Sequence, residues 1–340
     1  MALRGAHNPR IFQTRSIRYS FGYGLGVFPQ EGYEKSAKKP QIDVVHVVNN
    51  VSEFHATNVA QFPNHYSFMR LLGLPAITRV QLYGAGMYYN PYVRIEDDRG
   101  HESMIKYGIV SEDVIFQDLT EWSTFYLAGR LQKPVRHIFG ADLRLERANE
   151  YNLESAFNLS LVLLCLGKKI SLTTRDLYQK IALLSYMGDP RMIVGGENPN
   201  KVKNIVKRQM AYFEQLYDPA MQVALSKGYA TLKEGNLIVP KDASVFADIL
   251  AKLPIQFRLR LAQSYGKKYE YVPEAIDDPN SKFLKFMSSD THLRRTLLTT
   301  VLAIIAYPAL VQSLKGILTA GIVKSAKYAW EKKMKSLVKT

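Results

Sequence analysis

The fold is decided by a strand that enters a glycine-rich turn and by the apolar strand after it, Ile17-Arg18-Tyr19-Ser20-Phe21-Gly22-Tyr23-Gly24-Leu25-Gly26-Val27-Phe28 and Ile42-Asp43-Val44-Val45-His46-Val47-Val48. Short apolar and aromatic runs bounded by glycine or asparagine are typical of buried strands. The turn does not form the dinucleotide-binding motif, because Pro29 stands where the third glycine belongs, and no P-loop motif occurs. What remains is either an ordinary turn or a cradle of bare backbone amides for a phosphate.

Asp43 favours the phosphate cradle. This carboxylate stands inside an otherwise apolar strand, where its burial is costly unless it binds a metal or a cation. A glycine turn, a spacer loop and a strand with an aspartate is the arrangement of polymerase-β-type nucleotidyltransferases. In those proteins the turn holds a triphosphate and strand carboxylates hold Mg²⁺.

Composition and charge set further limits. The 340 residues are 47% apolar and 22% charged, which suits about two globular domains. The net charge of +15 gathers at the ends: residues 1–30 hold four arginines and no acid, and residues 291–340 hold nine Lys or Arg and one acid. The nearly neutral remainder argues against nucleic acid as a partner. The single cysteine, Cys165, excludes an intramolecular disulfide and a cysteine zinc cluster, and its apolar neighbours predict a buried thiol in a reducing compartment.

Periodicity predicts an α+β chain. Besides the two strands above, we expect a strand over 105–110, a hairpin tip at 96–101 and helices over 53–72 and 112–132. After residue 150 the pattern becomes helical, with helices expected over 152–166, 173–187, 199–227, 242–263 and 278–290. A strand–turn–strand at 229–239, turning at Glu234-Gly235-Asn236, interrupts them. Helices with one short hairpin fit a winged-helix-like module.

The two ends differ from the body. The N-terminal arginines, with serine and threonine between them, are typical of a mitochondrial import segment, or else form a basic arm of the fold. Residues 296–314 are uncharged, nearly the length that spans a bilayer, but Pro308 and several polar side chains count against spanning. Apolar residues then recur at helical spacing, with lysines from Lys315 onward expected on the polar side: Leu314, Leu318, Ile322, Ala326, Ala329 and Trp330. This pattern favours an amphipathic helix on an anionic membrane surface; the alternatives are a helix docked on the protein itself and a transmembrane helix.

A wider resemblance rests on motifs that run in order from residue 19 to the C-terminus. They are residues 23–28 with Asp43, 65–67, 83–90, 106–108, 126–134, 184–191, 196–206 and 315–321. The most specific is Tyr126-Leu127-Ala128-Gly129-Arg130-Leu131-Gln132-Lys133-Pro134. On these motifs the chain resembles the mitochondrial translocator assembly and maintenance family, the matrix-side CDP-diacylglycerol synthases.

The resemblance implies a polymerase-β-like nucleotidyltransferase domain with a mixed sheet (17–145). It would follow a basic import-like segment (1–16) and precede a winged-helix-like domain (146–290) and a membrane-associating segment (291–340). The implied reaction joins CTP and phosphatidic acid into CDP-diacylglycerol and pyrophosphate, with Mg²⁺, for cardiolipin synthesis on the matrix face of the inner membrane.

The implied roles follow the chemistry of that reaction. Asp43 would hold Mg²⁺, and the turn would bind the CTP phosphates through Tyr23, Gly24, Leu25 and Gly26. Alignment and charge neutralisation would come from four cations, Lys106, Arg130, Lys133 and Arg191. His65 is a further candidate, either as a ligand or as a structural hydrogen-bonding group.

Two departures from the family pattern stand out. Leu25 replaces the serine usual in the turn, and Val45 stands where a second strand carboxylate is expected, on the same face as Asp43. Either one metal ion suffices or the second ligand comes from elsewhere, and Asp118 is the candidate. The leading alternative function is a non-catalytic, membrane-peripheral assembly or maintenance factor for mitochondrial protein import; an RNA nucleotidyltransferase ranks below it.

Overall fold

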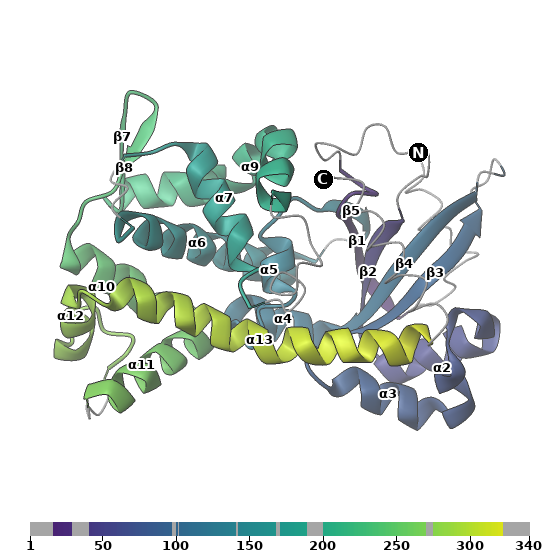
Figure 1. The fold of residues 1–340 in the computed structure, drawn as a ribbon. Coiled ribbons are helices and arrows are strands. Elements are labelled where there is room, and N and C mark those ends of the chain that lie inside the picture. Colours follow the sequence, from purple (N-terminus) through teal and green to yellow (C-terminus); the bar gives the residue numbers. More distant parts are fainter. Residues whose placement is uncertain are drawn as a thin grey trace.

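The computed structural model describes residues 16–28, 41–96, 100, 102–140, 142–167, 171–188, 200–269 and 275–321. Residues 1–15 of the predicted import segment, Arg191 and the basic stretch after Gly321 therefore lie outside the described residues. Figure 1 shows a half rich in strands and a half rich in helices, with the long helix α13 (Leu293–Ala320) running along both. The predicted α+β class is confirmed.

A mixed five-stranded sheet, in the order β3-β4-β2-β1-β5, forms the first half. Its strands are β1 (Ile17–Tyr23), β2 (Ile42–Val48), β3 (Tyr88–Glu96), β4 (Glu102–Ser111) and β5 (Arg136–Phe139). Strands β2 and β4 are parallel, and the other neighbouring pairs are antiparallel. The strands predicted at 17–23, 42–48 and 105–110 are confirmed, as is the hairpin tip, since Glu96 pairs with Glu102.

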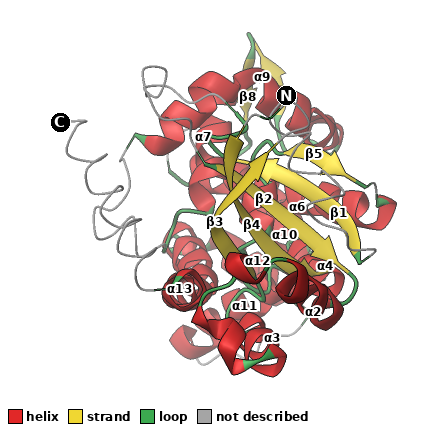
Figure 2. Cartoon of the chain, turned by 90° about the vertical axis from the view of Figure 1, so that its right-hand side faces the viewer, coloured by secondary structure: helices red, strands yellow, loops and turns green. Residues whose placement is uncertain are grey.

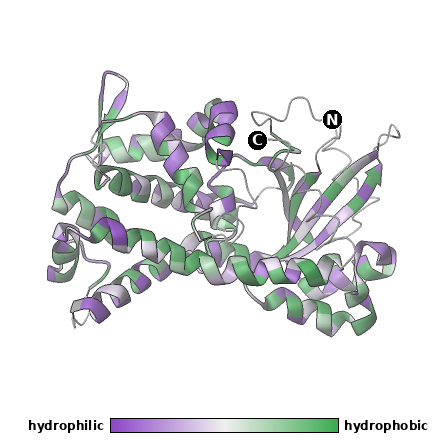
Figure 3. Cartoon of the chain, viewed as in Figure 1, coloured by the Kyte–Doolittle hydropathy of each residue, from purple (hydrophilic) through white to green (hydrophobic). Residues whose placement is uncertain are grey.

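Apolar side chains on both faces of the sheet divide the core into two layers. Figure 3 shows the hydropathy of the residues along these strands. Val45 and Val47 face a large cluster shared with the helical half, whereas Val44 and Val48 face a smaller one. The smaller cluster lies under α2 (Val51–Gln61), the 3-10 turns η1 (Pro63–His65) and η2 (Phe68–Leu72), and α3 (Leu74–Leu82). A single helix over 53–72 was the wrong prediction, because Pro63 lacks an N–H and disfavours helical geometry at the residue before it.

The predicted helix over 112–132 is also interrupted. It divides into α4 (Glu112–Glu121) and α5 (Ala128–Leu131), and Trp122 between them adopts left-handed geometry with φ +56°. The buried side chain of Asp118 accepts hydrogen bonds from the backbone of Thr124, Phe125, Leu127 and Ala128. These amides are thereby turned away from helical partners, which explains the break.

Helices dominate the second half, as expected. They are α6 (Leu143–Cys165), α7 (Thr174–Leu184), α9 (Lys201–Ser226), α10 (Ala243–Ala251), α11 (Ile255–Tyr269), α12 (Lys282–Ser289) and α13. A three-stranded sheet lies at their edge, with β6 (Ser171–Leu172), β8 (Asn236–Ile238) and β7 (Thr231–Lys233) in spatial order. Figure 1 shows β7 and β8, and Figure 2 shows β8 from the side.

Two details of the helical half bear on the predictions. The turn Glu234-Gly235 joins β7 and β8 with φ of +51° and +76°, so the predicted hairpin is confirmed. The helix predicted over 242–263 is two helices, because Pro254 separates α10 from α11. The expected boundary at 145/146 falls within the first turn of α6, and the one at 290/291 falls two residues before α13.

Candidate active site

The glycine turn at the end of β1 is packed tightly against the start of β2. Gly24 has φ +76°, and its carbonyl accepts the N–H groups of Val27 (3.1 Å) and Phe28 (2.9 Å). A Cβ atom on Gly26 would lie 2.5 Å from the carbonyl oxygen of Gln41 and 2.7 Å from the Cα of Ile42. Both positions therefore require glycine, Gly24 for its backbone conformation and Gly26 for close approach.

Asp43 lies beside this turn, on the face of the sheet that looks toward the helical half. It pairs with Tyr23 on β1 and with Lys106 on β4. Its carboxylate Oδ1 is 3.9 Å from the Lys106 Nζ, and the two side chains are 30% and 28% exposed, respectively. A Cβ on Gly24 would be 3.5 Å from the Asp43 Oδ2, so the carboxylate borders the turn directly. The structure thus brings Asp43, Lys106 and the predicted phosphate-binding turn together.

Arg130 on α5 completes this side of the site. Its guanidinium carbon lies 4.0 Å from the centre of the Tyr23 ring and 5.3 Å from that of Tyr126. Within the described part of the chain, its buried Nε has no hydrogen-bond partner. Lys106 makes a similar contact, with its Nζ 4.3 Å from the centre of the Tyr89 ring. Tyrosine rings therefore hold both cations above the sheet near Asp43.

Lys133 and Lys201 extend the positive charge toward α7 and α9. Lys133 Nζ donates hydrogen bonds to the Gly129 carbonyl and, at 2.6 Å, to the Ser185 hydroxyl. The Nζ atoms of Lys133 and Lys201 lie 5.3 and 4.9 Å from the centre of the same ring, that of Tyr186. Burial, followed by the charges of Arg130 and Lys201, lowers the pKa of Lys133 well below its usual value. An anion bound among these three cations would relieve that repulsion.

The carboxylate of Asp118 is fully engaged by hydrogen bonds and is not placed as a metal ligand. It is 1% exposed, and both of its oxygens accept hydrogen bonds from the segment 123–128. Four of these donors are backbone N–H groups, at 2.7 to 3.0 Å. Because a metal ion cannot occupy lone pairs already taken by amides, Asp118 serves instead to shape the loop that leads into α5 and Arg130.

His65 lies on the opposite side of the sheet. Its Nδ1 is 2.9 Å from the hydroxyl of Tyr107, and its ring stacks on Phe62 with centres 5.0 Å apart. Tyr107 follows Lys106 on β4 and therefore faces the smaller core, where Asn58 and Asn90 also donate to its hydroxyl. The structure does not bring His65 to the glycine turn, and Arg191 lies outside the described residues.

The residues present fit Mg²⁺ in one particular way. In the ranges that the structure describes, no three His, Cys, Asp or Glu side chains gather into a metal site. Protein-bound Mg²⁺ commonly takes one or two carboxylates and completes its shell with water and substrate phosphates. Asp43, partly exposed beside the turn, suits that mode as a single carboxylate ligand.

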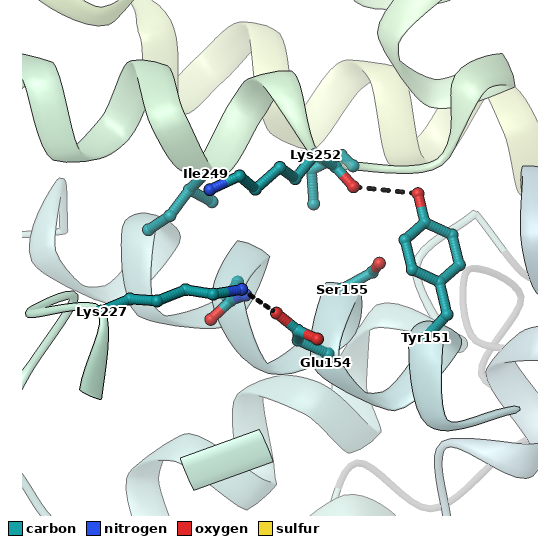
Figure 4. A pocket seen from close by; sticks show the side chains of 8 residues that line it. Tyr151, Glu154, Ser155, Lys227, Ile249 and Lys252 are labelled. Carbon is teal, nitrogen blue, oxygen red and sulfur yellow. Dashed lines mark hydrogen bonds and ion pairs between the residues drawn. The ribbon is translucent and has the colours of Figure 1, made fainter. Parts of the chain in front are cut away.

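A separate pocket of about 200 Å³ lies between α6, the end of α9 and α10, and Figure 4 shows its lining. Lys227 pairs with Glu154 at 2.9 Å, and the Tyr151 hydroxyl donates to the Lys252 carbonyl at 2.9 Å. The Lys252 ammonium is bound to Asp248 at 2.7 Å. Because its charged groups are already paired and none belongs to the cluster around Asp43, this pocket is not the candidate site.

Sequence reasoning missed the roles of Ser185, Tyr186 and Lys201 in the cation cluster. All three lie in quoted motifs, 184–191 and 196–206, so a signal was present. Nothing in the sequence, however, placed them beside Lys133, from which Ser185 is 52 residues distant.

Comparisons with known proteins cover nearly the whole chain. A family model described as "Phosphatidate cytidylyltransferase, mitochondrial" matches residues 10–335. The protein of that name from Saccharomyces cerevisiae is 35% identical over 94% of this chain and 67% of its own length. The Xenopus laevis protein is 35% identical over 96% of this chain and 92% of its own, and the Schizosaccharomyces pombe protein is 34% identical over 95% and 81%. The chain belongs to the mitochondrial phosphatidate cytidylyltransferase family.

Proposed function

We propose that this chain is a phosphatidate cytidylyltransferase with a nucleotidyltransferase-like first half. The reaction forms a bond between a phosphate oxygen of phosphatidic acid and the α-phosphorus of CTP. The bond between the α- and β-phosphates breaks, and pyrophosphate leaves. The observation that carries this proposal is the juxtaposition of Asp43 with the Gly24 turn on one side and with Lys106 and Arg130 on the other.

Each of these groups has a proposed role that suits its position. Backbone amides of the turn bind the CTP phosphates, and Asp43 is the ligand for Mg²⁺, which supplies charge neutralisation at the phosphates when bound. The attacking lipid phosphate is already an anion, so it needs alignment and charge relief more than a strong base. Lys106, Arg130, Lys133 and Lys201 supply positive charge to the two sets of phosphates, and Arg191 remains a proposed member on the motif alone.

The cellular setting is part of the proposal. The relatives are named mitochondrial, and the lipid substrate resides in a membrane, so we place the protein peripherally on the matrix face of the inner membrane, feeding cardiolipin synthesis. One described helix, α13, is long and apolar enough to cross a membrane, with 39% of its most apolar window buried in the protein. Its buried polar residues, including Lys315 and Gln312, favour a helix that lies on the protein and at the interface over one that spans.

The direct test is incubation of the purified full chain with labelled CTP, Mg²⁺ and vesicles that contain phosphatidate, followed by lipid extraction. Wild-type protein is expected to produce labelled CDP-diacylglycerol. Asp43→Asn should lower the rate by at least ~100-fold, the scale of losing a strong charge contact in the transition state. Its stability should change by no more than about 1 kcal/mol, because the carboxylate is partly exposed and only loosely paired.

Asp277→Asn, at an exposed acid in the helical half, is the matched control and should retain the wild-type rate. Absence of lipid product from wild-type protein that binds vesicles would favour the alternative of an assembly or maintenance factor for protein import. A near-normal rate for Asp43→Asn would remove Asp43 from the proposed site.

A further inference from the structure

The outward face of α13 is apolar over its C-terminal half. Large side chains on this face are exposed, namely Tyr307, Leu310, Leu314, Ile317 and Leu318. Between Arg295 and Lys324 the only charged residue is Lys315, which is 4% exposed. The helix therefore buries its charge and presents its hydrocarbon to the surroundings, the reverse of the usual arrangement on a protein surface in water.

Contacts on the inner side fix this orientation. Lys315 Nζ donates hydrogen bonds to the carbonyls of Gln81 (3.0 Å) and Tyr83 (2.6 Å), at the end of α3. Val311 packs directly against Gly84: a Cβ atom on Gly84 would lie 2.8 Å from the Val311 Cγ1. Rotation of α13 to bury its apolar face would break the two hydrogen bonds and the packing of Val311 against Gly84, so the exposed face is a fixed feature.

A second set of exposed apolar side chains adjoins this face. The Ser67 hydroxyl donates to the Leu318 carbonyl at 2.8 Å, which places η2 against the end of α13. Beyond Ser67, Leu71 is 80% exposed and Leu72 is 60% exposed, and Phe68, Leu82 and Tyr83 are exposed as well. We call the side chains of Phe68, Leu71, Leu72, Leu82 and Tyr83 the apolar rim. Figure 1 shows α3 beside the C-terminal end of α13.

Charge near the rim indicates what covers it. The chain leaves the described region at Gly321, where a Cβ atom would be 3.6 Å from the Ser67 side chain. The following residues, 322–340, contain six lysines and one glutamate. Arg70 and Arg79 on η2 and α3 are exposed beside the rim. Apolar side chains bordered by positive charge are complementary to an anionic bilayer, whose headgroups attract the cations while the acyl region accepts the hydrocarbon.

We propose that the apolar rim and the outward face of α13 together insert into an anionic lipid surface. The first half of the protein thus contacts the membrane directly, in addition to the C-terminal segment. Because the apolar rim, the glycine turn and Asp43 belong to the same sheet-containing half, this contact also fixes how the site is held over the bilayer. The proposal builds on the proposed function for the choice of lipid, and its test does not require catalysis.

The test is flotation of the full-length protein with phosphatidylcholine vesicles that contain phosphatidate, at ~0.15 M salt. The variant is Leu71→Glu with Leu72→Glu, at two side chains that are mostly exposed, so the fold should be retained. Its matched control is Leu143→Glu with Leu232→Glu, which are 74% and 59% exposed and lie outside η2, α3 and α13. We expect vesicle binding of the rim variant to fall by at least ~10-fold, with the control unchanged and equal melting temperatures for all three proteins.

Unchanged flotation of the rim variant would overturn the proposal. If flotation is unchanged and ultracentrifugation shows a wild-type dimer that the variant disrupts, the surface belongs to a second copy of the chain. The activity of wild-type protein on dispersed short-chain phosphatidate separates the two proposals. If wild-type protein forms product but the rim variant floats normally, the proposed membrane contact of the apolar rim is wrong and the proposed function stands. If flotation depends on the apolar rim but no product forms, the proposed function is wrong and the membrane contact stands.

Discussion

The substitution Asp118→Asn tests whether Asp118 is a structural residue or a metal ligand. The loss of stability that it should cause can be worked out from the hydrogen bonds in the structure. The carboxylate is buried, and its Oδ2 accepts the amides of Leu127 (2.8 Å) and Ala128 (3.0 Å). Its Oδ1 accepts the amides of Thr124 and Phe125, both at 2.7 Å. Asparagine keeps the shape but has one oxygen, so whichever way its amide group turns, an NH₂ group faces two buried N–H donors.

Two unpaired buried amides cost about 1–3 kcal/mol each, or roughly 2–6 kcal/mol together. The other two amides still donate to an oxygen, but that oxygen is now neutral. Because charge-assisted hydrogen bonds are roughly twice as strong as neutral ones, these two bonds are weakened as well. Since a domain is stable by only about 5–15 kcal/mol, we expect Asp118→Asn to lower the melting temperature by roughly 5–20 °C. Asp113→Asn, at an exposed acid on the same helix, is the control and should melt almost like wild type.

The assay is thermal unfolding of both variants with and without Mg²⁺ and CTP. Asp118→Asn should lose stability equally in the absence and presence of these ligands, and whatever folded protein remains should still be stabilised by them. A variant that melts like wild type but no longer responds to Mg²⁺ and CTP would refute the reasoning. In that case Asp118 would be the second metal ligand after all.

The other predictions concern single side chains. Leu25→Ser should tighten CTP binding or raise turnover several-fold in the lipid-product assay, because a hydroxyl bond to a phosphate is worth about 1 kcal/mol or more; a loss would mean that Leu25 packs productively. Lys201→Gln should raise the KM for a phosphate-bearing substrate by about 10-fold, with exposed Lys203→Gln as the control, and equal values would remove Lys201 from the site. Burial lowers the pKa of Lys315 to about 7. The unfolded state then binds more protons between pH 7 and the ordinary lysine value near 10.4, so the free energy of unfolding should rise with pH across that window. Lys315→Met should abolish this rise, measured as the free energy of unfolding from urea titrations at several pH values. An unchanged pH dependence in the variant would assign the rise to another group.

Local pattern accounted for the strands that build the site. The runs 17–23 and 42–48 are short, mostly apolar and bounded by turn residues, so the local sequence pattern was enough to predict their positions. The same reasoning failed over 112–132, where apolar periodicity continues through Trp122. The helix stops there because a buried carboxylate competes for its amides, and that competition depends on a side chain whose burial periodicity does not reveal.

The C-terminal helix shows a second limit. Spacing assigned Leu314 and Leu318 to an apolar side and Lys315 to a polar one, and the division between the two sides is correct. The spacing did not show that the polar side with Lys315 faces the protein, where two carbonyls at the end of α3 accept its hydrogen bonds. Which side of a helix faces the protein depends on the partner surface, and that surface is more than 200 residues away along the chain.

The cation cluster depends on close packing between the two halves of the chain. A Cβ atom on Gly129 would lie 2.5 Å from the Ser185 Cβ, so α5 meets the end of α7 with no space for a side chain. That approach lets Lys133 reach the Ser185 hydroxyl and share the Tyr186 ring with Lys201. Asp43 and the glycine turn come from the sheet, whereas Ser185, Tyr186 and Lys201 come from the helical half. In the proposed reaction a lipid phosphate meets a nucleotide phosphate, and the continuous core that joins the two halves holds groups from both of them at one place.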